Sequence, residues 1–333
     1  MLAKLNQARL SAFGHRQEYR KAMAMKGKRP AGVLGLGWAC FEAAAFGRTE
    51  HANTLDSYPD SVIRRVKFTS GGAHGWRISA LETPREAPPP WKIVVITGAP
   101  SWAEYWGPVM AALPADRQMV VVDRPGFAAS EPTVCITDIT IQARALEPVL
   151  EAAPGQKIIL VGQSYGAAIA SLMAANNPGK VASLVMLSSF LGETGPTSRW
   201  LVEMGQKLLS VIPRDLRHAI MEVSGQADQL HHMRAALGRL RIPVHVIHGD
   251  KDDFAPIETA ERLAKEIQTL HPIRFQAVAG ANHFLNDGPT DVLLAALEAC
   301  IPVEPARAAW RWPALPKFKW PFAPAREGLQ QAA

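Results

Sequence analysis

Residues 159–170 read Ile-Leu-Val-Gly-Gln-Ser-Tyr-Gly-Ala-Ala-Ile-Ala, and this stretch decides the fold of the chain. Its apolar, β-branched start predicts a buried strand, and the small residues after Gly166 predict a helix. Between them lies a turn of the form Gly-x-Ser-x-Gly, in which the serine takes a strained backbone conformation. A side chain at Gly162 or Gly166 would collide with neighbouring backbone. The hydroxyl of Ser164 is therefore expected to stand exposed beside the first N–H groups of the helix.

The five-residue pattern is weak evidence alone, because glycine and serine are common residues. Two later stretches supply what a nucleophilic serine needs. A strand-like run at 243–248 precedes a turn with acids at positions 250, 252 and 253, and a second strand-like run at 273–278 precedes His283. An acid and then a histidine, each after a strand, fit the order in which this turn acquires its orienting acid and its base.

On these residues the chain resembles the α/β-hydrolase family in its compact single-serine form, over residues 62–301. The resemblance implies an α/β fold with a doubly wound, mostly parallel eight-stranded sheet and a small helical lid. In that family the acid lies three residues after the glycine of a His-Gly turn and four before a proline, which selects Asp252 over Asp250 and Asp253. The histidine follows a Gly-x-x step, which selects His283.

Two earlier stretches are similar to further parts of that family. Residues 92–100 resemble the strand and loop that supply an oxyanion donor, with Thr97 in place of the usual histidine. The resemblance assigns that role to the N–H of Ala99, and the second donor is the N–H of Tyr165. Residues 119–130 resemble a turn of the form Asp-x-x-Gly-x-Gly-x-Ser. There Ala128 replaces the second glycine, a change that is tolerable at a negative φ.

The resemblance implies a mechanism. Ser164 attacks an acyl carbonyl, His283 accepts the serine proton, and Asp252 holds the imidazole in the productive tautomer. A carboxylic ester or a similar small acyl compound is the expected substrate, and neither a metal nor an organic cofactor is expected. We further expect three side chains to contact the substrate: Trp102, Gln163 and Phe284. For Trp102, packing on the first helix is the alternative.

Other reactions use the same three side chains. Carbon–carbon hydrolysis of a diketone, acyl transfer and cofactor-free perhydrolysis are the alternatives, and the sequence does not separate them from ester hydrolysis. A hypothesis from another class is a catalytically idle binding or scaffold protein whose ends do the work. The intact order of serine, acid and histidine counts against that hypothesis.

The pattern along the chain predicts five segments. They are a basic and apolar N-terminal arm (1–60), a first part of the hydrolase core (61–190), a helical lid (191–241), a second part of the core (242–301) and a basic tail rich in proline and tryptophan (302–333). Within the first part we expect strands at 64–68, 76–81, 93–96, 120–123, 157–161 and 181–187 and a helix at 142–151. Short apolar runs that alternate with helical segments are typical of a parallel sheet.

In the lid segment, large apolar residues recur at helical spacing. They are Trp200, Leu201, Met204, Leu208, Leu209, Ile212 and Leu216. This pattern favours an ordinary helix that buries one apolar face over a row of substrate contacts.

The formal charge of +6 is unevenly distributed. Residues 1–30 contain eight Lys or Arg and one acid, residues 301–333 contain five and two, and the remainder carries −4. Both ends combine cations with apolar or aromatic residues, which predicts peripheral contact with an anionic membrane surface. Edge packing of the arm and a disordered tail are the alternatives. Nucleic acid is not the expected partner, because the body of the chain is mildly acidic.

Composition agrees with a folded soluble enzyme. Of the 333 residues, 48% are hydrophobic, and no apolar stretch approaches the ~20 residues that cross a bilayer. The three cysteines, Cys40, Cys135 and Cys300, are widely spaced and lack metal-ligand spacing. They favour a reducing compartment over a disulfide framework. We therefore expect a cytoplasmic protein, with peripheral membrane contact as an added hypothesis.

Overall fold

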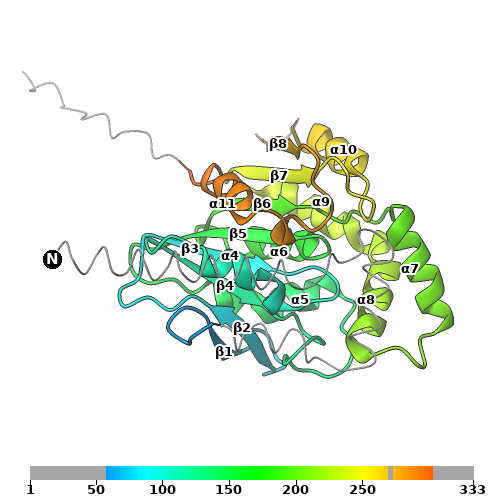
Figure 1. The fold of residues 1–333 in the computed structure, drawn as a ribbon, viewed down its shortest axis with the longest axis horizontal. Helices are drawn as coiled ribbons and strands as arrows, with labels where there is room; N and C mark the ends of the chain where they lie inside the picture. Colours follow the sequence, from blue (N-terminus) through cyan, green and yellow to red (C-terminus); the bar gives the residue numbers. More distant parts are fainter. Residues whose placement is uncertain (1–57, 269–272, 303–333) are drawn as a thin grey trace, which may run out of the picture. The chain divides into compact units, whose positions relative to one another are not determined.

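The computed structural model describes residues 58–268 and 273–302. Eight strands in these ranges form one sheet in the order β1-β2-β4-β3-β5-β6-β7-β8 (Figure 1). They are β1 (Arg64–Thr69), β2 (Arg77–Glu82), β3 (Trp91–Ile96), β4 (Arg117–Val122), β5 (Lys157–Gln163), β6 (Val181–Leu187), β7 (Val244–Gly249) and β8 (Ile273–Val278). The pairs β1–β2 and β2–β4 are antiparallel, and all later neighbours are parallel. The predicted mostly parallel eight-stranded sheet is confirmed.

The central strands are buried because helices cover both faces of the sheet. The helices are α4 (Gly107–Ala111), α5 (Ile139–Leu146), α6 (Gly166–Asn176), α7 (Pro196–Lys207), α8 (Arg214–Gly225), α9 (Leu230–Arg239), α10 (Ile257–Gln268) and α11 (Thr290–Glu298). Four short 3₁₀ segments join them within the described residues: η1 (Ala103–Trp106), η2 (Glu147–Leu150), η3 (Ala227–Gln229) and η4 (Leu285–Asp287).

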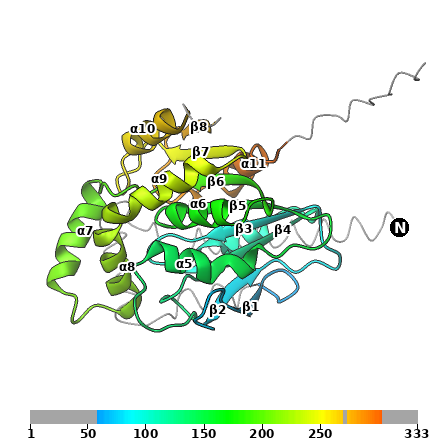
Figure 2. The same cartoon turned by 180° about the vertical axis from the view of Figure 1, so that it is seen from behind.

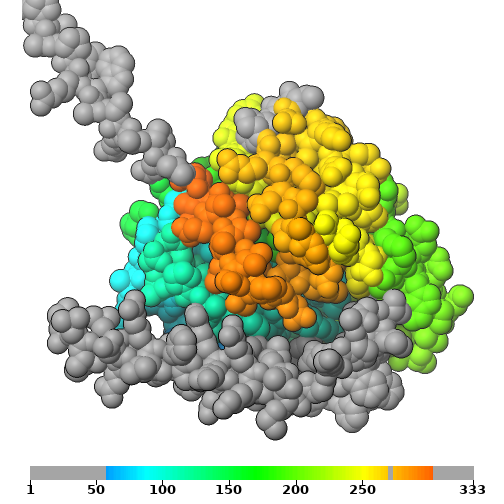
Figure 3. All heavy atoms as spheres, turned by 45° about the horizontal axis from the view of Figure 1, so that its top comes forward, coloured from blue at the N-terminus to red at the C-terminus, as the bar shows by residue number. Residues whose placement is uncertain are grey.

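Two apolar clusters hold the layers together, one on each face of the sheet. The larger cluster joins the sheet to α5, α6, α9 and α10, which lie in front in Figure 2. The other joins the opposite face to α4 and α11. In Figure 3 the orange residues of α11 lie beside residues from the first half of the chain. There an ion pair of 2.7 Å links Arg117 to Glu298. Two covered faces explain why the central strands read as continuous apolar runs.

The strand order reverses at β3, which pairs in parallel with both β4 and β5. In doubly wound sheets, ligands bind beyond the carboxyl ends of the strands at such a reversal. Ile96 of β3 is in register with Gly162 of β5. The loop after β3 and the turn after β5 therefore start side by side, and these are the two segments for which the sequence predicts the oxyanion donors and the serine.

Helices α7, α8 and η3–α9 fill the interval between β6 and β7, where the lid was expected. The expected burial of an apolar face on the first of these helices is wrong. Trp200 and Met204 in α7, and Leu208 directly after it, are exposed. The residues that α7 buries are Thr197, Ser198 and Gly205. Thr197 and Ser198 bond to the loop after β7, and Gly205 packs against α8, so small and polar residues make the contacts.

The predicted N-terminal arm falls outside the described residues except for positions 58–60, and the tail falls outside them except for Pro302. Within the described residues no helix is long and apolar enough to cross a membrane.

Candidate active site

Ser164 occupies the sharp turn between β5 and α6. Its φ is +51°, a left-handed conformation that costs a non-glycine residue on the order of 1–3 kcal/mol and persists only where the surroundings fix it. A Cβ atom at Gly162 would lie 2.5 Å from Cα of Ala167, and one at Gly166 would lie 2.3 Å from the carbonyl oxygen of Ile96. Both predicted glycine requirements are confirmed. Close approach of helix and strand thus holds Ser164 at the strand end.

Three side chains from distant parts of the sequence form a hydrogen-bonded row here. Ser164 Oγ lies 2.9 Å from His283 Nε2, and His283 Nδ1 lies 2.8 Å from Asp252 Oδ2. An ionised carboxylate only accepts hydrogen bonds, so Nδ1 carries the proton that is donated to Asp252. In the neutral imidazole, Nε2 is then an acceptor that faces the serine hydroxyl. This geometry suits removal of the proton from Ser164.

Asp252 is buried and well supplied with donors. Its Oδ1 accepts the backbone N–H groups of Phe254 and Ala255 at 2.9 and 2.8 Å. Its Oδ2 accepts from His283 and lies 3.0 Å from Nε2 of His248. Burial favours the neutral acid, but the hydrogen bonds from His248 and His283 outweigh it and hold the pKa of Asp252 well below its usual range. The carboxylate therefore stays charged beside His283.

The two neighbouring acids have other partners. Asp250 accepts the backbone N–H of Gly280 at 2.7 Å, and Asp253 accepts the hydroxyl of Thr197 at 2.6 Å. Of the three carboxylates in this turn, the structure brings Asp252 to His283.

His248 is a contact of Asp252 that the sequence analysis did not connect with it. The side chain is fully buried, and its Nε2 also lies 2.9 Å from the carbonyl oxygen of Ala255. Because both of these neighbours are acceptors, Nε2 carries the proton. His248 is the second-to-last residue of β7, four residues before Asp252, and the His-Gly pair was the signal that could have found it.

The loop after β3 touches the serine. A Cβ atom at Gly98 would lie 2.9 Å from Cβ and 3.5 Å from Oγ of Ser164, so this loop passes as close as a bare backbone allows. Thr97, which replaces the usual histidine, bonds through its hydroxyl to Ser101 and to the carbonyl oxygen of Val122. Ala99 follows Gly98 directly, and Tyr165 lies at the N-cap of α6. Both predicted donors thus belong to segments that meet at Ser164.

The three predicted substrate contacts have different surroundings. Trp102 donates from Nε1 to Asp215 of α8 at 2.6 Å. Gln163 has both ends of its amide bonded, to Trp106 at 2.9 Å and to Asn286 at 2.6 Å, which favours a supporting role over a polar contact with substrate. Phe284 lies edge-on to His283 at 5.3 Å and remains partly exposed. Among the three, Phe284 packs against the ring of His283.

The turn after β4 departs from expectation at one residue. Ala128 has φ +47°, so the condition of a negative φ is not met and the alanine sits in a conformation that favours glycine. Asp215 Oδ2 accepts the N–H of Ala128 at 3.0 Å, and Arg214 donates to its carbonyl oxygen at 2.8 Å. These bonds from α8 explain how the strained alanine is held.

A buried ion pair lies between this turn and α8. Arg124 and Glu222 are both fully buried and bonded twice, at 2.6 and 2.7 Å. Gln142 donates to the same carboxylate at 2.7 Å. Sequence reasoning missed this pair, because nothing local to either residue indicates a partner 98 positions away.

Comparison with known proteins agrees with the fold described above. Residues 92–220 match the model of the α/β hydrolase fold. A 2-hydroxy-6-oxononadienedioate/2-hydroxy-6-oxononatrienedioate hydrolase of Paraburkholderia phymatum is 33% identical over 207 residues, which are 50% of this chain and 71% of that protein. The chain belongs to the α/β-hydrolase family. A hydrolase with the same description from Dechloromonas aromatica is 26% identical over 207 residues, covering 50% of this chain and 71% of that one.

Solved structures with the α/β-hydrolase fold are also similar to the chain. A membrane phospholipase A described as a bacterial virulence factor has a TM-score of 0.57 at 20% identity, covering 80% of this chain and 95% of that one. Carboxylesterase CesB from Bacillus subtilis has a TM-score of 0.56 at 14% identity, covering 78% and 98%. At these identities the likeness shows the fold of this α/β-hydrolase.

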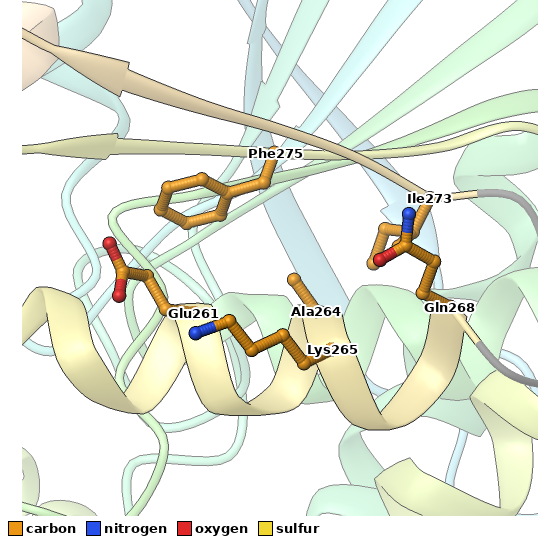
Figure 4. A pocket seen from close by; sticks show the side chains of 6 residues that line it. All are labelled: Glu261, Ala264, Lys265, Gln268, Ile273 and Phe275. Atoms are coloured by element: carbon orange, nitrogen blue, oxygen red, sulfur yellow. The ribbon is translucent and has the colours of Figure 1, made fainter.

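Other potential sites on the α/β-hydrolase are less informative. Across the described residues, no group of three or more His, Cys, Asp or Glu side chains is placed to hold a metal ion. A pocket between α10 and β8 is lined by Glu261, Ala264, Lys265, Gln268, Ile273 and Phe275 (Figure 4). It contains none of the residues that the sequence predicts for the site.

Proposed function

We propose that this α/β-hydrolase cleaves a carboxylic ester or a similar acyl compound, with Ser164 as the nucleophile. The observation that carries the proposal is the row in which Ser164 Oγ lies 2.9 Å from His283 Nε2 and His283 Nδ1 lies 2.8 Å from Asp252. Nucleophile, base and orienting acid at hydrogen-bond distance are the arrangement that activates a serine. A catalytically idle protein has no need of it.

The reaction proceeds in two steps. Ser164 Oγ attacks the acyl carbonyl carbon while His283 Nε2 takes the serine proton, and the N–H groups of Ala99 and Tyr165 receive the oxyanion. His283 then gives the proton to the departing alcohol, which leaves an acyl group on Ser164. A water molecule attacks that acyl-enzyme with His283 again as base, releasing the acid and restoring the serine.

Two features favour a neutral ester. The rings of Phe254 and Phe284 pack on the His283 ring, with ring centres 5.2 and 5.3 Å from its centre. An apolar group of a substrate therefore meets apolar side chains beside His283. Arg124, the buried cation of the turn after β4, is already neutralised by Glu222 and offers no free charge to a carboxylate of a substrate. Esters with small apolar acyl groups are therefore the first substrates to test.

The test combines labelling with a substrate panel. A fluorophosphonate should label the full-length protein once, at Ser164, and Ser164→Ala should abolish both labelling and hydrolysis of p-nitrophenyl esters. Peptide mapping that places the label elsewhere, or undiminished hydrolysis by Ser164→Ala, would contradict the proposal. An unlabelled, inactive wild type would instead favour the idle binding protein.

Carbon–carbon hydrolysis is the second candidate, favoured by one observation. The relative that is 33% identical is named for a 2-hydroxy-6-oxo diacid, whose name contains a ketone and no ester. Supplying such a vinylogous diketone alongside the ester panel separates the two reactions. A higher kcat/KM for the diketone would assign carbon–carbon cleavage to the same Ser164 nucleophile.

We also propose that the basic ends of the chain bring the hydrolase to an anionic membrane surface. The support is the charge distribution, because residues 1–30 and 301–333 carry +7 and +3 around a body of −4. Lysine and arginine near such a surface are attracted to anionic lipid, and neighbouring aromatic residues favour the headgroup region.

A further inference from the structure

We propose that Arg124 is a positioning residue of the oxyanion hole: its guanidinium fixes the peptide unit that carries the N–H of Ala99. The inference deepens the proposed function and rests on it.

The guanidinium of Arg124 bonds the loop after β3 at two consecutive carbonyls. Its Nε donates to the carbonyl oxygen of Thr97 at 2.9 Å, and its Nη2 donates to that of Gly98 at 2.7 Å. Arg124 is fully buried, so water does not compete for these bonds. Two bonds from one rigid fork fix the direction of both carbonyls.

The second carbonyl belongs to the peptide unit that joins Gly98 to Ala99. That unit is trans and planar, so its C=O and its N–H point in opposite directions. With the oxygen of Gly98 held at Arg124, the N–H of Ala99 is aimed away from the guanidinium. Gly98 itself lies against Ser164, because a Cβ atom added at this glycine would come within 2.9 Å of Ser164 Cβ. The bond from Arg124 to the carbonyl oxygen of Gly98 therefore fixes the candidate oxyanion donor, the N–H of Ala99, beside Ser164.

Arg124 is held in turn by partners from two helices. Its Nη1 donates to Gln142 of α5 at 2.7 Å and to Glu222 of α8 at 2.6 Å, and its Nη2 also donates to Glu222 at 2.7 Å. With the two loop carbonyls, these bonds match the five N–H donors of a guanidinium. Its Cζ lies 4.8 Å from the ring centres of Phe127 and of Tyr165. A lysine has three donors without a planar fork, and cannot reproduce this set.

This arrangement acts on the reaction in two ways. It restricts the backbone conformation of the loop after β3, so the N–H of Ala99 is in place before charge develops on the substrate oxygen. It also polarises the Gly98–Ala99 peptide unit, because a charged donor on the C=O strengthens the N–H as a donor. Glu222 neutralises the guanidinium, and therefore Arg124 works through the peptide unit and leaves the substrate to Ser164 and the two N–H groups.

The test uses the full-length protein and two variants. Arg124→Gln/Glu222→Gln removes both buried charges together, so neither is left unpaired. Arg124→Lys keeps the positive charge but lacks the planar guanidinium that bonds both loop carbonyls. For p-nitrophenyl acetate we expect each variant to lose kcat by about 10²-fold, since one oxyanion donor is worth about that factor. We expect KM to change by less than about threefold, because the interaction forms in the transition state.

A second measurement separates positioning from folding. A phenyl trifluoromethyl ketone forms a tetrahedral adduct with a reactive serine, and its affinity should fall by the same factor as kcat in both variants. The matched control is Met233→Ala, which opens a cavity beneath α9 and removes none of the side chains that hydrogen-bond the loop after β3 or Ser164. It should lower the melting temperature while kcat and the affinity for the ketone stay at the wild-type level.

Two outcomes are distinguishable. A wild type that neither hydrolyses the ester nor reacts at Ser164 would overturn the proposed function itself. A wild type that does both, with kcat of Arg124→Lys or of the folded double variant within about twofold of it, overturns the role of Arg124 alone.

Discussion

The two oxygens of Asp252 face different groups: Oδ1 accepts two backbone N–H groups, and Oδ2 faces His283 and His248. An amide at this position permits the wrong imidazole tautomer. We expect Asp252→Asn to lower kcat by on the order of 10⁴. The matched controls Asp250→Asn and Asp253→Asn should stay near wild type, since those carboxylates bond to Gly280 and Thr197. Measuring kcat for ester hydrolysis by the three variants tests this prediction. A low kcat in Asp253→Asn together with a wild-type kcat in Asp252→Asn would contradict the geometry.

Asp252 also makes folding stability depend on pH. Its pKa in the folded protein lies below the value of about 3.9 in an unfolded chain. A depressed pKa stabilises the folded state fully at pH values above the unfolded pKa, and that contribution is lost as the pH falls toward the folded value. The free energy of unfolding measured in urea should therefore fall more steeply below about pH 4 for wild type than for Asp252→Asn. Parallel curves in that window would show that the carboxylate is not specially stabilised.

Replacement of Ala128 by glycine is expected to stabilise the folded protein. At φ +47° an alanine is strained by about 1–2 kcal/mol, while glycine loses roughly 0.5–1 kcal/mol more chain entropy on folding. We expect Ala128→Gly to stabilise the protein by up to about 1 kcal/mol in chemical denaturation. Ala295→Gly on the exposed side of α11 is the control, and should destabilise by about 1 kcal/mol. Equal losses for both variants would show that position 128 is unstrained.

Site residues that belong to a local sequence pattern could be predicted from the sequence. The glycines around Ser164, the acid after β7 and the histidine after β8 each follow a strand and a turn signal. The network of Arg124 could not be predicted in this way. Glu222 is an ordinary acid on an amphipathic helix, and only the folding of α8 over the loop after β3 brings it to Arg124.

At the scale of elements, strands were predicted best. The predicted strands at 181–187 and 273–278 match β6 and β8, because a mostly buried apolar run in β6 and an alternation of apolar and polar residues in β8 are each bounded by turn residues. The helix predicted at 142–151 instead spans 139–146 as α5 and continues as η2. Asp138 accepts the N–H groups of Thr140 and Ile141 and so begins the helix earlier, a capping signal that the hydrophobic pattern alone does not contain.

The packing of α7 on α8 gives a prediction for the helical segment between β6 and β7. A Cβ atom at Gly205 would lie 2.0 Å from Cδ1 of Ile220, so the two helices approach through this glycine. We expect Gly205→Leu to cost about 1–3 kcal/mol by overpacking and to push α7 away from α8. We propose that residues 191–241, which fill the interval expected for a lid, select the acyl or alcohol groups that enter, so the ranking of esters by acyl length should change while a small fluorophosphonate still labels Ser164.

Gly225 provides the matched control for that change. It ends α8, and apart from the adjoining backbone of its own helix nothing lies within 4 Å of an added Cβ there. Gly225→Ala should be neutral or stabilise by up to about 1 kcal/mol, with an unchanged ester ranking. Thermal denaturation and the ester panel measure both effects. An unchanged ranking in a folded Gly205→Leu would count against selection of substrates by this segment.

At the scale of the molecule, the sheet explains why a site exists where it does. The reversal of strand order at β3 brings the loop with Ala99 beside the turn with Ser164, and the later parallel strands carry Asp252 and His283 to the same edge. The order of strands could be expected only through the family resemblance, since apolar periodicity indicates strands without indicating their neighbours. The described residues thus form a catalytic body, while most of the net positive charge lies in the two ends of the chain.

That division of charge predicts how the whole protein meets a lipid surface. Residues 1–30 carry +7 and residues 301–333 carry +3, whereas the body carries −4, so the ends should be drawn to anionic lipid. Each Lys or Arg near the surface contributes about 1 kcal/mol and is screened by salt, while inserted Trp and Phe rings resist salt. Co-sedimentation should be stronger with anionic than with neutral liposomes, and only partly reversed by salt. Removing residues 306–333, which include Trp310, Trp312 and Trp320, should weaken chiefly the salt-resistant part. Equal recovery in the supernatant with and without anionic vesicles at low salt would contradict a membrane role for either end.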